Sequence, residues 1–158
     1  MEFTHINEKG EARMVDVTEK SVTARTALAR GRIRLTPAIL KAILDQAVPK
    51  GDVFGVARVA GILAAKQTDR LIPMCHPLPL TGCEVEFAIL EEELAIEATC
   101  LAKVEGKTGI EMEALTAVSV ALLSIYDMCK AIDKGMVIED ICLLKKTGGK
   151  SGTYERSK

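Results

Sequence analysis

The sequence contains very few aromatic residues. It has no Trp, and its 158 residues include only two Tyr and three Phe. Proteins that bind single-stranded nucleic acid stack successive bases on aromatic side chains, and this chain offers few such rings. The formal net charge of -1 agrees, because an electrostatic footprint on DNA or RNA needs a strong excess of Lys and Arg. We therefore expect no nucleic-acid partner.

Paired cysteines are also missing. The five cysteines are odd in number, and no two of them have the C-x-x-C spacing. This pattern argues against both a disulfide framework and a zinc ribbon. His76 is one of only two histidines and has no second His or Cys at ligand spacing, so we expect no metal site.

Targeting and membrane signals are not evident. The N-terminus does not resemble a signal peptide, and no apolar run approaches the roughly 20 residues that a membrane helix needs. We expect a chain without a membrane partner in a reducing cytoplasm. Hydrophobic residues at 48% and charged residues at 27% are typical of a folded chain, and the length predicts one domain over residues 1–158.

Strand and helix patterns follow one another along most of the chain. Residues 1–20 are predicted to be a polar arm with at most one short strand at 14–17, and residues 145–158 a mobile, basic, Gly-rich tail. Thr36 and Pro37 are a good helix start, and Asp52 can cap a second helix. Three prolines predict an extended loop at 73–79. Strands are predicted at 21–36, 83–90, 94–103 and 136–144, and helices at 38–46, 53–71 and within 106–134.

This order of elements is β, α, α, β, β, α, β. It is a split β-α-β pattern with an additional helix, and the simplest architecture is α+β, with an antiparallel four-stranded sheet and helices on one face. Such a sheet leaves an edge and a back face open. We expect another copy of the chain to cover them.

The stretch 106–134 combines the best helix pattern with charges that a core helix does not need. One face is an ordinary apolar stripe. Its residues are Leu115, Val118, Leu122, Ile125 and Cys129. A second line is interrupted by charge and includes Glu113, Thr116, Val120, Asp127 and Lys130. A carboxylate or an amine on a buried helix face does not stabilise the fold, so we treat this line of residues as a candidate site.

Asp127 and Lys130 are three residues apart, which fits either an ordinary helix ion pair or part of a catalytic group. If Lys50 and Lys146 converged with Lys130, mutual repulsion would lower a lysine pKa toward neutrality and provide an acid or base. Glu113 and Asp127 are separated by 14 positions, or about 21 Å along a helix, which is too far for one small site. We therefore predict sites shared between two subunits whose long helices are antiparallel.

Two Gly-Lys turns and the His76 loop remain ambiguous. Both turns lack the first glycine of the phosphate-binding P-loop, since Leu101 and Leu144 stand where it is required. The turn at 106–109 fits an anion at a helix start or a plain capping turn equally well. His76 stands in a proline-held loop and fits an active-site ring or a structural histidine.

Four segments together closely resemble the cyclic pyranopterin monophosphate synthase family of molybdenum-cofactor biosynthesis. They are MVDVTEK at 14–20, PKGDVFGVARVAGILAAKQTDRLIPMCHPLPL at 49–80, GKTGIEMEALTAVSVALLSIYDMCK at 106–130 and LLKKTGGKSG at 143–152. The resemblance spans residues 4–152. It implies a ferredoxin-like α+β subunit in a homohexamer, a trimer of dimers with sites at the dimer interface.

The resemblance also implies a reaction. The substrate is (8S)-3',8-cyclo-7,8-dihydroguanosine 5'-triphosphate, and the products are cyclic pyranopterin monophosphate and diphosphate, so the enzyme is a lyase. No metal or organic cofactor is implied, because the steps are acid/base chemistry: opening of the five-membered purine ring, building of the pterin, and closure of a cyclic phosphate.

Residue roles come from the same resemblance. Asp127 is the acid/base and works with Lys50 and Lys130. Met74, Cys75, His76, Met112 and Glu113 hold the purine and the sugar, and Glu111 faces the same pocket. Arg25, Lys146 and Lys150 are the triphosphate ligands, which stabilise the charge that develops on leaving diphosphate.

Two other classes of function stay open. A non-enzymatic module of the same architecture binds metabolites between subunits, and a phosphate-transfer enzyme would use the Gly-Lys turns. A binding module would not need Lys50, Asp127 and Lys130 to converge. A phosphate-transfer enzyme would be recognised by its dependence on Mg²⁺. The order of proton transfers, the lysine that is neutral at rest, and closure of the tail over substrate do not follow from the residues.

Overall fold

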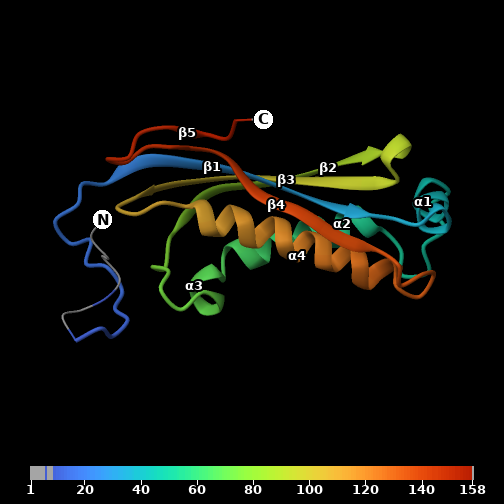
Figure 1. Ribbon diagram of the computed structural model, residues 1–158, viewed down its shortest axis with the longest axis horizontal. Helices are drawn as coiled ribbons and strands as arrows, with labels where there is room; N and C mark the ends of the chain where they lie inside the picture. The colour runs from blue at the N-terminus through green and yellow to red at the C-terminus, as the bar shows by residue number, and fades with distance from the viewer. Residues whose placement is uncertain (1–5, 7–8, 158) are drawn as a thin grey trace.

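A twisted antiparallel sheet with two long helices packed on one face positions everything else (Figure 1). The computed structural model describes residue 6 and residues 9–157. Within them the sheet has five strands in the order β2-β3-β1-β4-β5, with all neighbours antiparallel. The strands are β1 Thr23–Arg34, β2 Leu80–Leu90, β3 Ala95–Gly106, β4 Val137–Thr147 and β5 Tyr154–Glu155.

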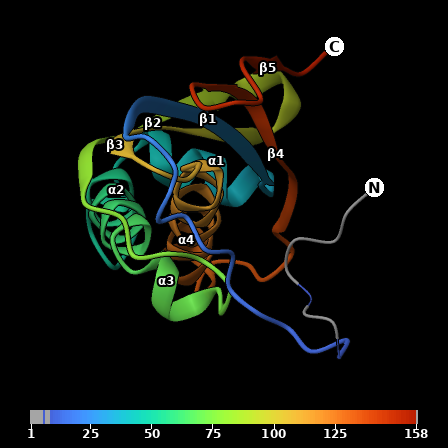
Figure 2. The same cartoon turned by 90° about the vertical axis from the view of Figure 1, so that its left-hand side faces the viewer.

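The helices form a layer on the other side of the core. They are α1 Pro37–Leu44, α2 Val53–Ala65, α3 Thr68–Leu71 and α4 Glu111–Cys129, with a short 3-10 turn, η1 Glu91–Glu93, between β2 and β3. Figure 2 shows α2 and α4 side by side beneath the sheet. The α+β class and the antiparallel sheet with helices on one face are therefore confirmed.

The predicted number of strands is wrong, because the chain after β4 turns back as β5. Gly148 and Gly149 have positive φ angles, which lets the chain reverse so that Lys145 pairs with Glu155 and Lys146 with Tyr154. The predicted mobility of this tail stays a prediction. Of the predicted arm, residues 1–5, 7 and 8 lie outside the described residues, and residues 14–17 have no strand.

Helix starts and stops follow the sequence signals in part. Asp52 caps α2 as predicted, its side chain accepting a hydrogen bond from the Gly55 N–H at 2.9 Å. Thr36 precedes α1, but its buried hydroxyl has no hydrogen-bond partner among the described residues. The helix predicted to reach residue 71 ends at Ala65 and is followed by the single turn α3. The helix within 106–134 begins at Glu111, and residues 107–110 form the loop between the end of β3 and this helix.

The core lies where α4 crosses the sheet and α2. Val118, Leu122 and Ile125 on the predicted apolar stripe are fully buried. Gly31 lets α4 approach β1, because a Cβ on Gly31 would come within 2.8 Å of side-chain atoms of Val118 and Leu122. The pairing of β1 with β4 is also irregular at this glycine, since its register shifts between Arg30 and Arg32.

By length and composition alone, the 19-residue helix α4 is long and apolar enough to cross a membrane. Half of this apolar stretch of α4 is buried inside the protein, where it forms the central core. Its apolar character is therefore accounted for by packing against the sheet and α2, and it is weak support for a membrane span.

We predict that Gly31→Ala lowers the free energy of unfolding by about 1–3 kcal/mol, because the added methyl group overlaps the α4 side chains. Gly82→Ala is the matched control on β2, since its Cβ would meet only the Lys103 side chain at 3.5 Å or more. We expect the control to change stability by no more than about 0.5 kcal/mol. Chemical denaturation at fixed protein concentration measures both, and equal effects would contradict the close-approach explanation.

Candidate active site

The C-terminal end of α4 carries a compact group of charges, which we call the triad: Lys50, Asp127 and Lys130. The Lys50 ammonium contacts one carboxylate oxygen of Asp127 at 2.6 Å and also donates to the Asp127 backbone carbonyl at 3.0 Å. The Lys130 ammonium contacts the other carboxylate oxygen at 2.6 Å. Lys50 comes from the turn before α2, so the fold joins residues that are 77 positions apart in the chain.

Both ammonium groups stabilise the ionised form of Asp127. Lys130 first, and then Lys50, lower the pKa of Asp127 to about 2, and Asp127 in turn raises the pKa of Lys130. Asp127 is therefore a carboxylate at neutral pH. The pKa of Lys130 is raised and not lowered, because Asp127 lies between the two amines. Lys146 lines a different cavity, so the convergence of three lysines on which a lowered lysine pKa depended is not seen within one chain.

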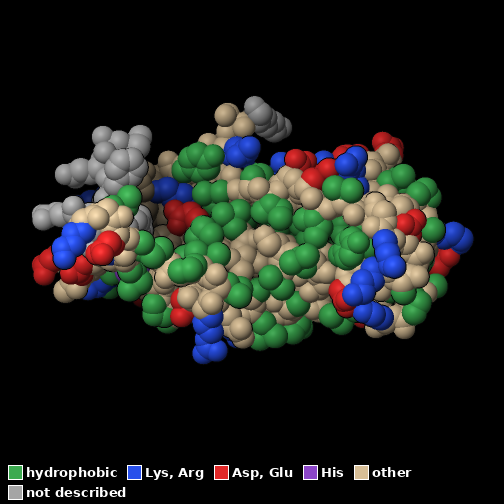
Figure 3. Space-filling view, turned by 60° about the horizontal axis from the view of Figure 1, so that its bottom comes forward, with side chains coloured by type: hydrophobic (Ala, Val, Ile, Leu, Met, Phe, Trp, Pro, Cys, Tyr) green, Lys and Arg blue, Asp and Glu red, His purple; other side chains and the backbone are tan. Residues whose placement is uncertain are grey.

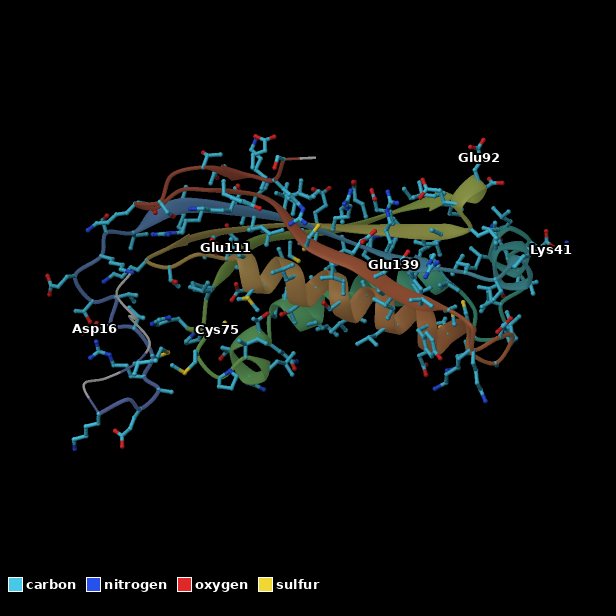
Figure 4. The ribbon with its side chains drawn as sticks, viewed as in Figure 1. Asp16, Lys41, Cys75, Glu92, Glu111 and Glu139 are labelled. Atoms are coloured by element: carbon cyan, nitrogen blue, oxygen red, sulfur yellow. The ribbon has the colours of Figure 1, made fainter. Side chains whose placement is uncertain are left out.

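The other end of α4 borders a cavity of about 300 Å³, which we call the end cavity. Its walls come from the proline-held loop, the first turn of α4, the loop before it and part of the N-terminal arm. The lining residues are Val15, Val17, Lys20, Met74, Cys75, His76, Leu78, Thr108, Gly109, Glu111, Met112 and Glu113. The structure thus brings together all six residues predicted to hold the purine and sugar. Figure 4 shows Cys75 and Glu111 at this same end of the helix.

Burial changes the acidity of two groups in the end cavity. The Glu113 side chain is buried, and loss of hydration raises its pKa to about 7, with smaller contributions from the negative charges of Glu111 and Asp69. Burial also raises the pKa of the Cys75 thiol. His76 is not free in the cavity, since its Nε2 atom lies 2.8 Å from the Val15 carbonyl oxygen.

A basic cleft of about 870 Å³ adjoins the end cavity and shares Lys20, Thr108 and Gly109 with it. Its lining includes two predicted triphosphate ligands, Arg25 and Lys150. The third, Lys146, lines a neighbouring cavity of about 450 Å³ together with Glu111, and its ammonium contacts the Ser151 hydroxyl. Ser151 lines both spaces, so the three cations surround one region of the molecule.

Sequence reasoning missed several residues of this end. Lys20, Lys107 and Thr108 line the cleft, although two of them stand in the Gly106–Gly109 turn that drew attention as an anion site. Lys20 is the last residue of MVDVTEK, one of the four segments that resemble the family. This position was the feature of the sequence that could have identified Lys20 as a site residue.

The triad and the end cavity do not meet within one chain. Glu113 and Asp127 are on the same straight helix, which keeps them about 21 Å apart. One chain therefore presents two separate groups of candidate site residues, at opposite ends of α4. Among residue 6 and residues 9–157, no group of three or more His, Cys, Asp or Glu side chains could hold a metal ion, and the expected independence from metals stays a prediction.

Comparisons with known proteins agree on one family. The model of the MoaC family matches residues 14–149. A cyclic pyranopterin monophosphate synthase from Peptoclostridium acidaminophilum is 60% identical, over 99% of this chain and 98% of the relative. Proteins of the same name from Thermoanaerobacter pseudethanolicus and Desulfitobacterium hafniense are 56% and 58% identical over 99% of this chain, and the match covers 99% and 95% of those relatives.

The buried Glu113 gives a prediction about pH. Its pKa is about 4.5 in an unfolded chain and about 7 in the fold, so the unfolded state loses its proton first as pH rises. The free energy of unfolding should fall by up to about 3 kcal/mol between pH 4.5 and 7 for this reason. Glu113→Gln cannot ionise, so we expect its stability relative to the unmodified protein to rise between pH 4.5 and 7 and to level off above pH 7.

Denaturant titrations at several pH values measure this difference. Glu105→Gln is the matched control, because Glu105 is an exposed carboxylate on β3. An unchanged pH slope in Glu113→Gln would contradict the burial effect.

Proposed function

The chain belongs to the MoaC family, and we propose that it catalyses the reaction after which its relatives are named, the synthesis of cyclic pyranopterin monophosphate. It acts as a lyase of molybdenum-cofactor biosynthesis and releases diphosphate from the cyclic dihydroguanosine triphosphate. The observation that carries this proposal is the triad. A pure binding module has no use for two ammonium groups on one ionised carboxylate at the end of a helix.

The triad has the groups that the acid/base steps require. Asp127 is ionised and accepts a proton from the substrate once a lysine yields its place, while Lys50 and Lys130 are the nearest proton donors. Two amines and a carboxylate thus serve ring opening and the later proton transfers. No cofactor takes part in this scheme.

The far end of α4 holds the substrate. Glu113, whose pKa near 7 lets it donate or accept, lies beside Met112, Cys75 and His76 and binds the purine and sugar. Arg25, Lys146 and Lys150 bind the triphosphate and stabilise the charge of the departing diphosphate. Glu111 lines both the end cavity and the cavity of Lys146, which supports a role for it between the sugar and the phosphates.

A complete site then needs two copies. Figure 3 shows apolar side chains across the middle of the helical face with charged groups toward both ends. The exposed apolar residues of these helices include Val56, Val59, Leu63 and Leu123. An antiparallel second copy covers this face and brings the triad of one subunit to the end cavity of the other. Three such dimers form the proposed homohexamer, each ferredoxin-like subunit lying in the cytoplasm.

A direct assay tests the activity. The purified protein is incubated with the cyclic dihydroguanosine triphosphate, and diphosphate and the cyclic pterin are measured. We expect both products without added Mg²⁺, whereas Mg²⁺-dependent phosphoryl transfer would favour the alternative enzyme class. No product from a folded oligomer would overturn the proposal.

Asp127→Asn should lower kcat by about 10²–10⁴, because the amide accepts no proton and pairs weakly with two ammonium groups. Asp45→Asn is the matched control, since Asp45 is an exposed aspartate in another Lys-Asp pair, with Lys41. Near-normal turnover by Asp127→Asn, with the oligomer intact by sedimentation, would remove Asp127 from the mechanism.

Mixing inactive variants tests the shared site. Asp127→Asn damages the triad and Glu113→Gln damages the end cavity, so a mixed dimer has one intact site. After subunit exchange about a quarter of the unmodified activity should return. Asp127→Asn mixed with Lys50→Ala is the control and should recover nothing, because both residues belong to the same half-site. Equal behaviour of the two mixtures, with mixed dimers verified by mass, would contradict shared sites.

A further inference from the structure

The N-terminal segment Val15–Lys20, which we call the strap, separates the end cavity from the basic cleft. Val15 and Val17 line the cavity, Asp16 and Glu19 line the cleft, and Lys20 lines both. The strap therefore forms a shared wall of the two spaces that are proposed to hold the purine and the triphosphate. Figure 4 shows Asp16 and Cys75 at the same end of the molecule.

Two side chains hold the strap by its backbone. The Lys107 ammonium donates to the Thr18 carbonyl at 2.8 Å, and His76 Nε2 lies 2.8 Å from the Val15 carbonyl oxygen. Because a carbonyl only accepts, His76 carries its proton on Nε2 in this contact. Both anchors stand in loops at the walls of the two spaces.

The strap makes a turn of its own between the anchors. The Thr18 N–H donates to the Asp16 carboxylate at 2.8 Å, and the Lys20 N–H donates to the Val17 carbonyl at 3.1 Å. This turn gives the segment a fixed shape, so it can move as a unit about its anchors. Asp16 is further favoured as a carboxylate by Lys107 and His76, which lie close enough to stabilise its charge.

Among the residues that the structure describes, few other contacts fix the strap to the protein. Val15 and Val17 are half-buried, and the other four residues are exposed. Segments with few buried contacts open at low free-energy cost, so the two anchors decide how often the strap is closed. Removal of one anchor therefore has a measurable effect on what the strap encloses.

We propose that Lys107 is a positioning residue that holds the strap closed over bound substrate through the Thr18 carbonyl. This inference rests on the proposed function. Lys107 fixes the wall that carries Val17 and Lys20, and it takes no part in the proton transfers. His76, the second anchor, exchanges its contact with Val15 for one with the substrate, after which Lys107 alone retains the strap.

Steady-state kinetics separate this role from a catalytic one. Lys107→Met keeps the apolar stem but loses the donor, and we expect KM to rise about tenfold while kcat changes less than about twofold. Lys107→Arg, which still donates to the carbonyl, should restore KM. Lys103→Met removes the same charge from an exposed position on β3 outside both spaces and should leave KM unchanged.

Hydrogen exchange provides a readout that does not depend on turnover. The amides of Thr18 and Lys20 should exchange faster in Lys107→Met than in the unmodified protein, and inorganic pyrophosphate should slow them in the unmodified protein only. The unmodified protein could show no synthase activity while the exchange of Thr18 and Lys20 still changes as expected. That result would contradict the proposed function but support the role of Lys107 in holding the strap. Unchanged KM and exchange in Lys107→Met, or a fall in kcat alone, would overturn the inference.

Discussion

The rigidity of α4 is the constraint on which the rest of the structure depends. The helix is fixed by fully buried Val118, Leu122 and Ile125 and by the close approach to Gly31, so it neither bends nor rotates without opening the core. Its length then sets the distance between Glu113 and Asp127. Chemistry that needs both ends must recruit a second subunit, and the core of one chain in this way determines the assembly of the proposed site.

The same helix carries two carboxylates whose environments drive their acidity in opposite directions. Glu113 is buried with few charges to compensate it, and its pKa rises to about 7, whereas Asp127 is half exposed between two ammonium groups and its pKa falls to about 2. In many enzymes, two carboxyl groups whose pKa values differ in this way take the separate roles of acid and base. On this argument Glu113 is the group that can carry a proton at neutral pH, and Asp127 is the group that can receive one.

Local patterns predicted the elements well, since the Asp52 cap, the apolar stripe of α4 and the proline-held loop all depend on nearby residues. The contact of Lys50 with Asp127 could not be predicted from spacing, because it depends on how α2 packs against α4, and only the family resemblance suggested it. The fifth strand was missed because Tyr154 and Glu155 make a pairing too short to leave an alternating pattern. The strap contacts use backbone carbonyls, which carry no residue signal at all.

The charge of the triad explains why it suits a shared site. Two ammonium groups and one carboxylate leave a net charge of +1, and about half of each side chain is exposed to water, which screens the group in a single chain. In the proposed dimer, a second subunit that covers the triad would reduce this screening and strengthen its attraction for an anion. In the proposed dimer, the surface that the second subunit brings carries Arg25 and Lys150 beside the carboxylates of Asp16 and Glu19. The excess of cations in such a site would attract a polyanion such as a nucleoside triphosphate.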